Sequence, residues 1–195
     1  NQQALIIQKA IDRGVEHHNA GRLSEAGNIY NQILQSEPNH PIVMHLLGVI
    51  AHQVGKNDIA VDLMAKALVL KPDFAEGHND LGLVLQAMGK LDDAVTSYHK
   101  ALEIKADYAE AHSNLGLVLQ DQGKLDDAVA SYNKALAIKP DFTEAHSNFG
   151  LTLQDQGKLG DAVTSYRKAI AIKPDLAEAH YNLGNALQDQ GKLEN

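Results

Sequence analysis

Amide side chains return once every 34 residues and are the groups in this sequence best suited to binding chemistry. Asn114, Asn148 and Asn182 share one position of this interval, and Asp80 stands in the same register. A carboxamide has an acceptor oxygen and an NH2 group with two donors, which matches the C=O and N–H of a peptide unit. A regular series of carboxamides can therefore hold an extended chain by its backbone, without reading the side chains of that chain.

Four histidines repeat at the same interval and raise the question of a metal site. Equivalent residues in successive repeats are too far apart to share an ion, because zinc requires its ligands about 2.0 Å from the metal. We therefore expect these imidazoles to pack between helices, and we expect no metal site. The residues are His78, His112, His146 and His180.

Combinations of side chains that could support catalysis are missing from the sequence. Asp92-Asp93 and Asp126-Asp127 are pairs of adjacent acids, and adjacent side chains on a helix diverge instead of converging on a substrate. The Gly-Lys dipeptides lack the GxxxxGK[ST] spacing of a phosphate loop. The chain also has no cysteine. We expect no enzymatic activity and no cofactor.

The charge balance and the apolar segments exclude two classes of partner. With 17 Lys and Arg against 25 Asp and Glu, the formal net charge is −8, which would repel a nucleic acid backbone. The longest apolar segment, residues 42–54, is interrupted by polar side chains and falls short of the ~20 residues that a membrane span needs. A chain without cysteine is compatible with the cytoplasm, which is the expected location.

Gly-Lys or Gly-Arg dipeptides mark an internal repeat that fills the chain. Unit 143–176 is identical to unit 109–142 at 26 of 34 positions, which chance does not produce. Such periods are typical of stacked repeat architectures. The interval divides residues 1–195 into a single array with repeats at 7–40, 41–74, 75–108, 109–142 and 143–176 and a partial unit at 177–195.

Within a repeat, the apolar residues follow a helical period in two separate stripes. In unit 109–142, Leu115 and Leu119 share one face of a first helix, and Ala128 and Tyr132 share one face of a second helix. The pattern predicts two helices per repeat.

Glycine and proline are expected to define where these two helices end. Gly123 can adopt the left-handed conformation that closes the first helix, and Pro140 prevents continuation of the second. Asp141 stands three residues before Glu144, the spacing of a capping box for the next helix. Lys139 is expected in the last turn of the second helix, where positive charge is favourable.

The period and the residues that recur at fixed positions within it resemble the tetratricopeptide repeat family over essentially the whole chain. The Leu-Gly pairs, the small residue Ala128, the aromatic Tyr132 and the terminal Pro140 are typical of that family's repeat. The resemblance implies an all-α fold, in which antiparallel helix pairs stack into a right-handed superhelix, an α-solenoid, with an inner groove lined by the first helices. The regular asparagines are similar to those in the repeats of O-linked N-acetylglucosamine transferases.

Function in such an array is expected on the solvent-facing side of the first helices, opposite the core stripe. A helical wheel predicts a polar and acidic groove with a line of leucines along its floor. Glutamates stand where carboxylate-clamping arrays carry Lys, so we expect a neutral, hydroxyl-rich or basic protein or peptide segment in extended conformation. The predicted groove residues are Asn79, Asp80, Leu83, Glu110, Ser113, Asn114, Leu117, Gln120, Asp121, Glu144, Ser147, Asn148, Leu151, Gln154, Tyr181, Asn182 and Asn185.

Two alternatives to a free-standing binding scaffold remain. The chain can be the substrate-recruiting region of a larger glycosyltransferase, as the resemblance of its asparagines implies. It can also be a structural protein that self-associates, because the helix over residues 177–190 lacks a following helix. Leu183, Ala186 and Leu187 are expected to form the apolar face for a second copy.

Overall fold

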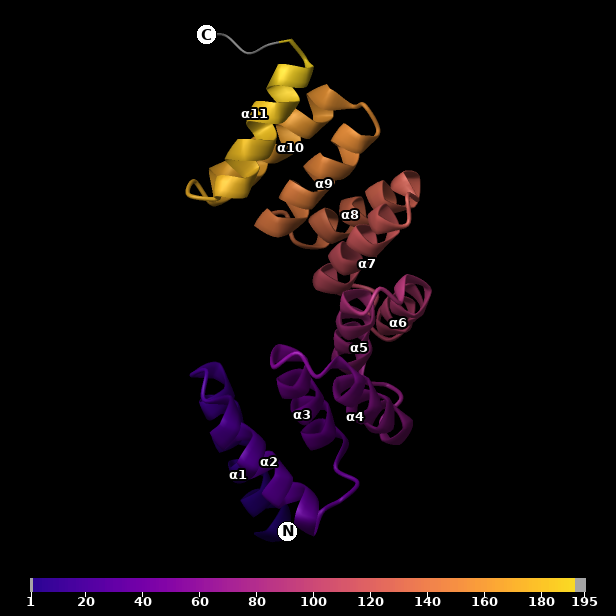
Figure 1. Cartoon of the computed structure of the whole chain (residues 1–195). Helices are drawn as coiled ribbons and strands as arrows, with labels where there is room; N and C mark the ends of the chain where they lie inside the picture. The colour runs from indigo at the N-terminus through magenta and orange to yellow at the C-terminus, as the bar shows by residue number, and fades with distance from the viewer. Residues whose placement is uncertain (1, 192–195) are drawn as a thin grey trace. The chain divides into compact units, whose positions relative to one another are not determined.

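The computed structural model describes residues 2–191, which form eleven α-helices and no strand (Figure 1). The all-α fold expected from the helical periodicity is thus confirmed. The helices are α1 (Gln2–Asn19), α2 (Leu23–Ser36), α3 (Pro41–Gln53), α4 (Asn57–Leu70), α5 (Ala75–Ala87), α6 (Leu91–Ile104), α7 (Ala109–Asp121), α8 (Leu125–Ile138), α9 (Thr143–Asp155), α10 (Leu159–Ile172) and α11 (Ala177–Asp189).

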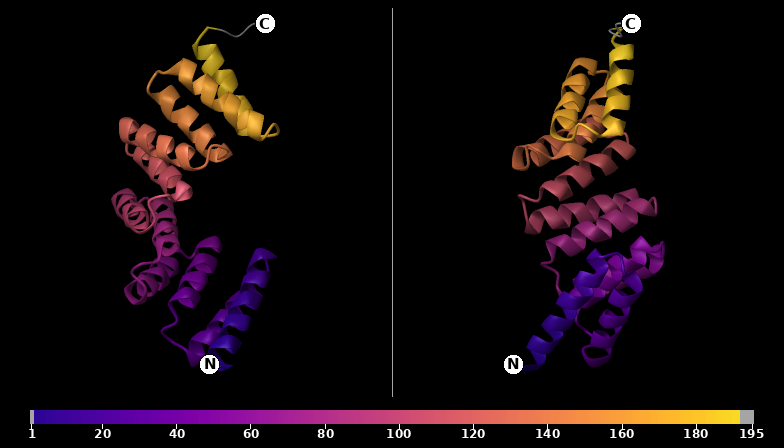
Figure 2. Two further views of the ribbon diagram at one scale, coloured as in Figure 1. Left: turned by 180° about the vertical axis from the view of Figure 1, so that it is seen from behind. Right: turned by 90° about the vertical axis from the view of Figure 1, so that its left-hand side faces the viewer.

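The helices alternate between a first and a second member of a repeat, as in a helical repeat solenoid. Contacts divide the chain into two compact units, an N-terminal unit up to Ser97 and a C-terminal unit from Tyr98, with the division inside α6. From α7 to α11 each helix contacts the next, and Figure 2 shows α9, α10 and α11 side by side. The predicted repeat bounds stay a prediction, and the last four residues of unit 177–195 lie outside the described residues.

Glycine ends the first helix of a repeat as expected. Gly123 has a φ of +73°, a conformation that a side chain with a Cβ adopts only at a cost. The Lys124 amide donates to the carbonyl of Leu119 at 2.9 Å, and the Gly123 amide donates to the carbonyl of Gln120 at 2.8 Å. These two bonds satisfy carbonyls at the end of α7 and turn the chain toward α8.

The capping box predicted at Asp141 and Glu144 is wrong. The N-cap residue of α9 is Phe142, whose side chain makes no capping hydrogen bond, so Asp141 lies one residue outside the cap. Phe142 occupies this place because its ring packs against Lys139, with the ammonium nitrogen 4.6 Å from the ring centroid. Lys139 itself is the C-cap residue of α8, one position beyond the predicted last turn.

Buried tyrosines on α8 and α10 join these helices to α7 and α9. Tyr132 and Tyr166 are completely buried. A Cβ placed on Gly116 would lie 2.9 Å from the Tyr132 ring, and a Cβ on Gly150 would lie 2.6 Å from the Tyr166 ring. Only a residue without a side chain lets the two helices approach this closely. Each tyrosine thus packs on the bare backbone of a first helix.

The apolar face predicted for self-association is wrong for Ala186. This residue is fully buried in a core cluster with Leu153 and Tyr166, and Leu183 and Leu187 are half-buried against the same cluster. α11 packs on α9 and α10 through these side chains, so they already have partners within the C-terminal unit. Self-association through Leu183 and Leu187 stays a prediction.

Replacing Gly150 by Ala tests the glycine–tyrosine contact. We expect Gly150→Ala to lower the free energy of unfolding by about 1–3 kcal/mol, because the added methyl group forces the Tyr166 ring aside. Gly160→Ala in α10 is the matched control, since its nearest neighbour would be 3.8 Å away, and it should raise stability by up to about 1 kcal/mol. Urea denaturation measures both. Equal stability of the two variants would contradict the contact.

Candidate functional site

The first helices α7, α9 and α11 place the repeating asparagines in the C-terminal unit. Each of Asn114, Asn148 and Asn182 is half-buried, so each reaches the molecular surface. Within the described range 2–191, the carboxamides of Asn148 and Asn182 have no hydrogen bond to another group. α7 contacts α9, and α9 contacts α11. The equivalent positions therefore stand on neighbouring helices.

Glutamines of the predicted groove bond across to the next repeat instead of remaining open. Gln120 Nε2 donates to Asp155 Oδ2 at 2.7 Å, and Gln154 Nε2 donates to Asp189 Oδ2 at 3.0 Å. The oxygen of each glutamine is also occupied. Thr152 donates to Gln120 Oε1 at 2.8 Å, and the hydroxyl of Tyr166 donates to Gln154 Oε1 at 3.1 Å. These glutamines hold adjacent first helices in place.

Three residues predicted for the groove are buried. Asn79, Ser113 and Ser147 are each 4% exposed, so they offer no surface to a partner. The helical wheel assumed one covered arc per first helix, whereas α7 and α9 also contact each other. A wheel of one helix leaves such contacts out.

The apolar positions of the predicted groove do reach the surface. Leu83 is 37% exposed and Leu151 is 36% exposed, while Leu117 is half-buried. On α11, Tyr181 is 70% exposed and Asn185 is half-buried. The first helices thus present isolated apolar side chains among polar ones.

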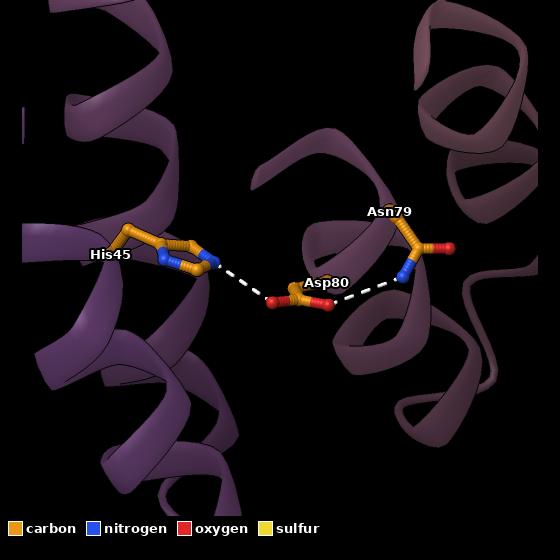
Figure 3. A network of polar contacts seen from close by, with 3 residues as sticks. All are labelled: His45, Asn79 and Asp80. Carbon is orange, nitrogen blue, oxygen red and sulfur yellow. Dashed lines mark hydrogen bonds and ion pairs between the residues drawn. The ribbon is translucent and has the colours of Figure 1, made fainter. Parts of the chain in front are cut away.

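A histidine and an aspartate form a polar contact between the first helices α3 and α5 of the N-terminal unit (Figure 3). His45 Nε2 lies 2.9 Å from Asp80 Oδ2, and Asn79 Nδ2 donates to Asp80 Oδ1 at 3.2 Å. The buried His45 ring packs edge-on against Phe74. The Asp80 carboxylate therefore has a partner on both oxygens.

Sequence reasoning did not identify His45 as the partner of Asp80. The sequence contains a signal for this pair, because His45 and Asp80 are 35 positions apart. The same separation joins Gln120 to Asp155 and Gln154 to Asp189. A search for complementary side chains at this separation would have found all three pairs.

Exposed carboxylates of the first helices give this surface its acidity. Glu144 and Asp121 are exposed, and Glu110 accepts a hydrogen bond from Lys139 Nζ at 3.2 Å. The backbone N–H of Glu110 itself, followed by Lys139, lowers the pKa of the Glu110 carboxyl below its usual value. These carboxylates disfavour an acidic partner on this face.

The periodic histidines tie the loops to the first helices, a role the sequence did not indicate. His112 Nε2 lies 3.0 Å from the carbonyl oxygen of Ala106, and His146 Nε2 lies 2.9 Å from that of Pro140. His78 and His180 make the same contact with Pro72 and Pro174. The predicted packing role is confirmed for the buried His78, His112 and His146, whereas His180 is exposed.

The described residues 2–191 bear on two predictions, the absence of a metal site and the absence of a membrane-spanning helix. These residues contain no group of three His, Asp or Glu side chains that could hold a metal ion. None of the helices in this range is both long and apolar enough to cross a membrane. The cytoplasmic location stays a prediction.

Two family models match the sequence. One described as "Tetratricopeptide repeat" matches residues 73–141, and one described as "TPR repeat" matches residues 153–191. Together they account for more than half of the chain. A comparison with curated proteins finds no match.

Several solved structures are similar over most of the chain. MamA is 27% identical, with 85% of this chain and 96% of MamA covered and a TM-score of 0.73. PilW, described as a widely conserved type IV pilus biogenesis factor, is 22% identical, with 96% and 87% covered and a TM-score of 0.89. YrrB, described as a TPR protein with an unusual peptide-binding site, is 23% identical, with 88% and 89% covered and a TM-score of 0.71. The similarity to PilW and to YrrB shows that both proteins share the fold of this chain.

Burial of His112 predicts a pH-dependent stability. Burial, the largest cause, lowers the pKa of this imidazole below its usual 6.5. The unfolded chain therefore binds more protons than the folded chain just below pH 6.5, and the free energy of unfolding falls as the pH drops through that range. We expect His112→Gln, which keeps a donor for the Ala106 carbonyl, to lose less stability between pH 7 and pH 5.

Thermal unfolding at the two pH values measures this difference. His180→Gln is the matched control, because His180 makes the same carbonyl contact at 2.8 Å but is exposed. Its pH dependence should follow that of the unaltered protein. An identical pH dependence for His112→Gln would refute the role of His112.

Proposed function

The chain belongs to the tetratricopeptide repeat family, and we propose that it is a non-catalytic scaffold that binds a protein or peptide segment in extended conformation along its first helices. The observation that carries the proposal is the pair of half-buried carboxamides of Asn148 and Asn182, which have no partner within residues 2–191. A polar group at a partly buried position is most stable when it is hydrogen-bonded. A peptide backbone supplies both the donor and the acceptor that a carboxamide can use.

The spacing of the asparagines suits an extended chain. Asn148 and Asn182 stand on α9 and α11, which are in contact, and packed helices lie about 8–10 Å apart. Three residues of an extended chain span ~10 Å. One carboxamide can therefore engage the guest backbone at about every third residue, with Asn114 as the next position on α7.

Apolar and charged neighbours would add selectivity to this backbone contact. Leu117 and Leu151 lie one turn after Asn114 and Asn148 and reach the surface, so they give shallow apolar contact. Glu144 and Asp121 are exposed and favour neutral, hydroxyl-rich or basic segments. Surface charge of this kind mainly increases the rate of association and excludes acidic competitors.

The proposed contact surface is smaller than the sequence suggested. Asn79, Ser113 and Ser147 are omitted because they are buried, and Gln120 and Gln154 are omitted because both ends of each carboxamide are bonded. The peptide-binding site named for YrrB is compatible with this use of the fold. Recruitment of substrates for a larger glycosyltransferase stays a prediction.

Removing the three carboxamides together tests the proposal. The probe is a fluorescent peptide of alternating Ser and Lys, and the change is Asn114→Ala with Asn148→Ala and Asn182→Ala. Because each lost hydrogen bond costs about 0.5–1.5 kcal/mol, we expect about 10- to 1,000-fold weaker binding by fluorescence anisotropy.

An asparagine on a second helix away from both proposed sites provides the control. Asn31→Ala changes an exposed asparagine of α2 and should leave the affinity for this peptide unaltered. Circular dichroism confirms that each variant keeps its helices. Unaltered affinity of a fully helical triple variant would remove the mechanism.

A further inference from the structure

A groove lies on the second helices of the C-terminal unit, outside the asparagine face. It has a volume of about 940 Å³ and runs between α8 and α10, with Phe149 of α9 in its floor. The side chains of α10 that line it extend from Lys158 at the N-cap to Ile172 at the last residue. Ile172 is 40% exposed. The groove thus follows the whole length of α10.

The length of the groove sets the length of its occupant. The fourteen-residue separation of Lys158 and Ile172 corresponds to about 21 Å of helix. An extended chain of about six residues spans this distance.

The two walls of the groove differ in chemistry. The α10 wall carries the exposed Lys158 and Lys168, with Asp161 between them. Neither lysine forms an ion pair with another residue in the range 2–191. The α8 wall is apolar at Val129 and Leu136. Since alternate residues of an extended chain point to opposite sides, one side of a guest would meet charge and the other would meet aliphatic groups.

We propose that this groove is a second binding site, for an extended peptide segment with acidic residues at positions i and i+4 and apolar residues at i+1 and i+3. Lys158 and Lys168 are ten residues apart, or ~15 Å along α10. Positions i and i+4 of an extended chain are ~13 Å apart and lie on one side. Each acid can thus pair with one lysine, and Asp161 disfavours a third acid at i+2.

The neighbouring groove carries the opposite charge. A cavity of about 790 Å³ lies between α8 and the part of α6 in the C-terminal unit. Its α8 wall runs from Asp127 to Ile138, ~17 Å of helix. Glu103 and Asp127 outnumber Lys134 among its charged lining groups. An acidic segment therefore distinguishes the two grooves by charge alone.

A pair of peptides tests the proposed site. The first is a fluorescent, end-capped peptide containing Asp-Leu-Ser-Leu-Asp, and the second contains Lys-Leu-Ser-Leu-Lys. Fluorescence anisotropy at low salt should show binding of the acidic peptide, weakened about 5-fold or more by Lys158→Gln with Lys168→Gln, because two charge pairs are lost. Lys134→Gln, in the neighbouring groove, is the matched control and should leave its affinity unaltered.

A second variant tests the groove without changing its charge. Ala171 is exposed and lines the groove beside Ile172, so Ala171→Trp fills the space that the guest would occupy. We expect this variant to weaken binding of the acidic peptide as well. Equal affinity of Ala171→Trp and the unaltered protein, with helices intact, would overturn the proposal.

Methyl resonances separate this site from the asparagine face. The acidic peptide should shift the methyl signals of Val129 and Leu136, and the Ser-Lys peptide should shift those of Leu117 and Leu151. The variant without the three asparagines should still bind the acidic peptide. Shifts at Leu117 and Leu151 with the acidic peptide, or no binding of it, would refute the second site and leave the proposed function intact.

Discussion

The packing of a tyrosine ring on the bare backbone of a glycine sets the geometry of the α7–α8 and α9–α10 pairs. Tyr166 lies so close to Gly150 that a side chain would not fit between them. At this short distance the Tyr166 hydroxyl reaches Gln154, which is also on α9, and donates to its side-chain oxygen. Gln154 in turn reaches Asp189 on the next first helix. A steric constraint inside one repeat thus leads to a polar contact between repeats. Burial raises the pKa of the Tyr166 hydroxyl well above its usual value, so the hydroxyl keeps its proton and stays a donor.

These internal contacts decide which polar groups of the first helices remain for a partner. The glutamines and the aspartates that they meet are occupied, and Ser113 and Ser147 are buried. Within the described residues, the carboxamides of Asn148 and Asn182 are left, and they stand on α9 and α11. A guest chain would therefore meet donors and acceptors that are already in place, so little conformational entropy is lost in the protein on binding.

The features that depend on neighbouring residues could be predicted from the sequence. The left-handed turn at Gly123 and the end of α8 before Pro140 follow from the conformational limits of glycine and proline. The cap at Phe142 is also local, since its ring packs on Lys139, three residues earlier. The burial of Ser113 could not be predicted in this way, because it depends on how α7 packs against other helices. The groove beside α10 was missed for a related reason. A wheel of one helix shows which face is apolar, and the space between two second helices depends on how far apart they pack.

The glycine–tyrosine contact is the same in successive repeats, at Gly116 with Tyr132 and at Gly150 with Tyr166. Excision or duplication of one complete period would join surfaces that already fit each other. Shortening or lengthening the chain by a whole period would therefore keep this contact within the α7–α8 and α9–α10 type of helix pair. Gain or loss of whole repeats would thus change the number of contact positions along the protein without changing the residues inside a repeat.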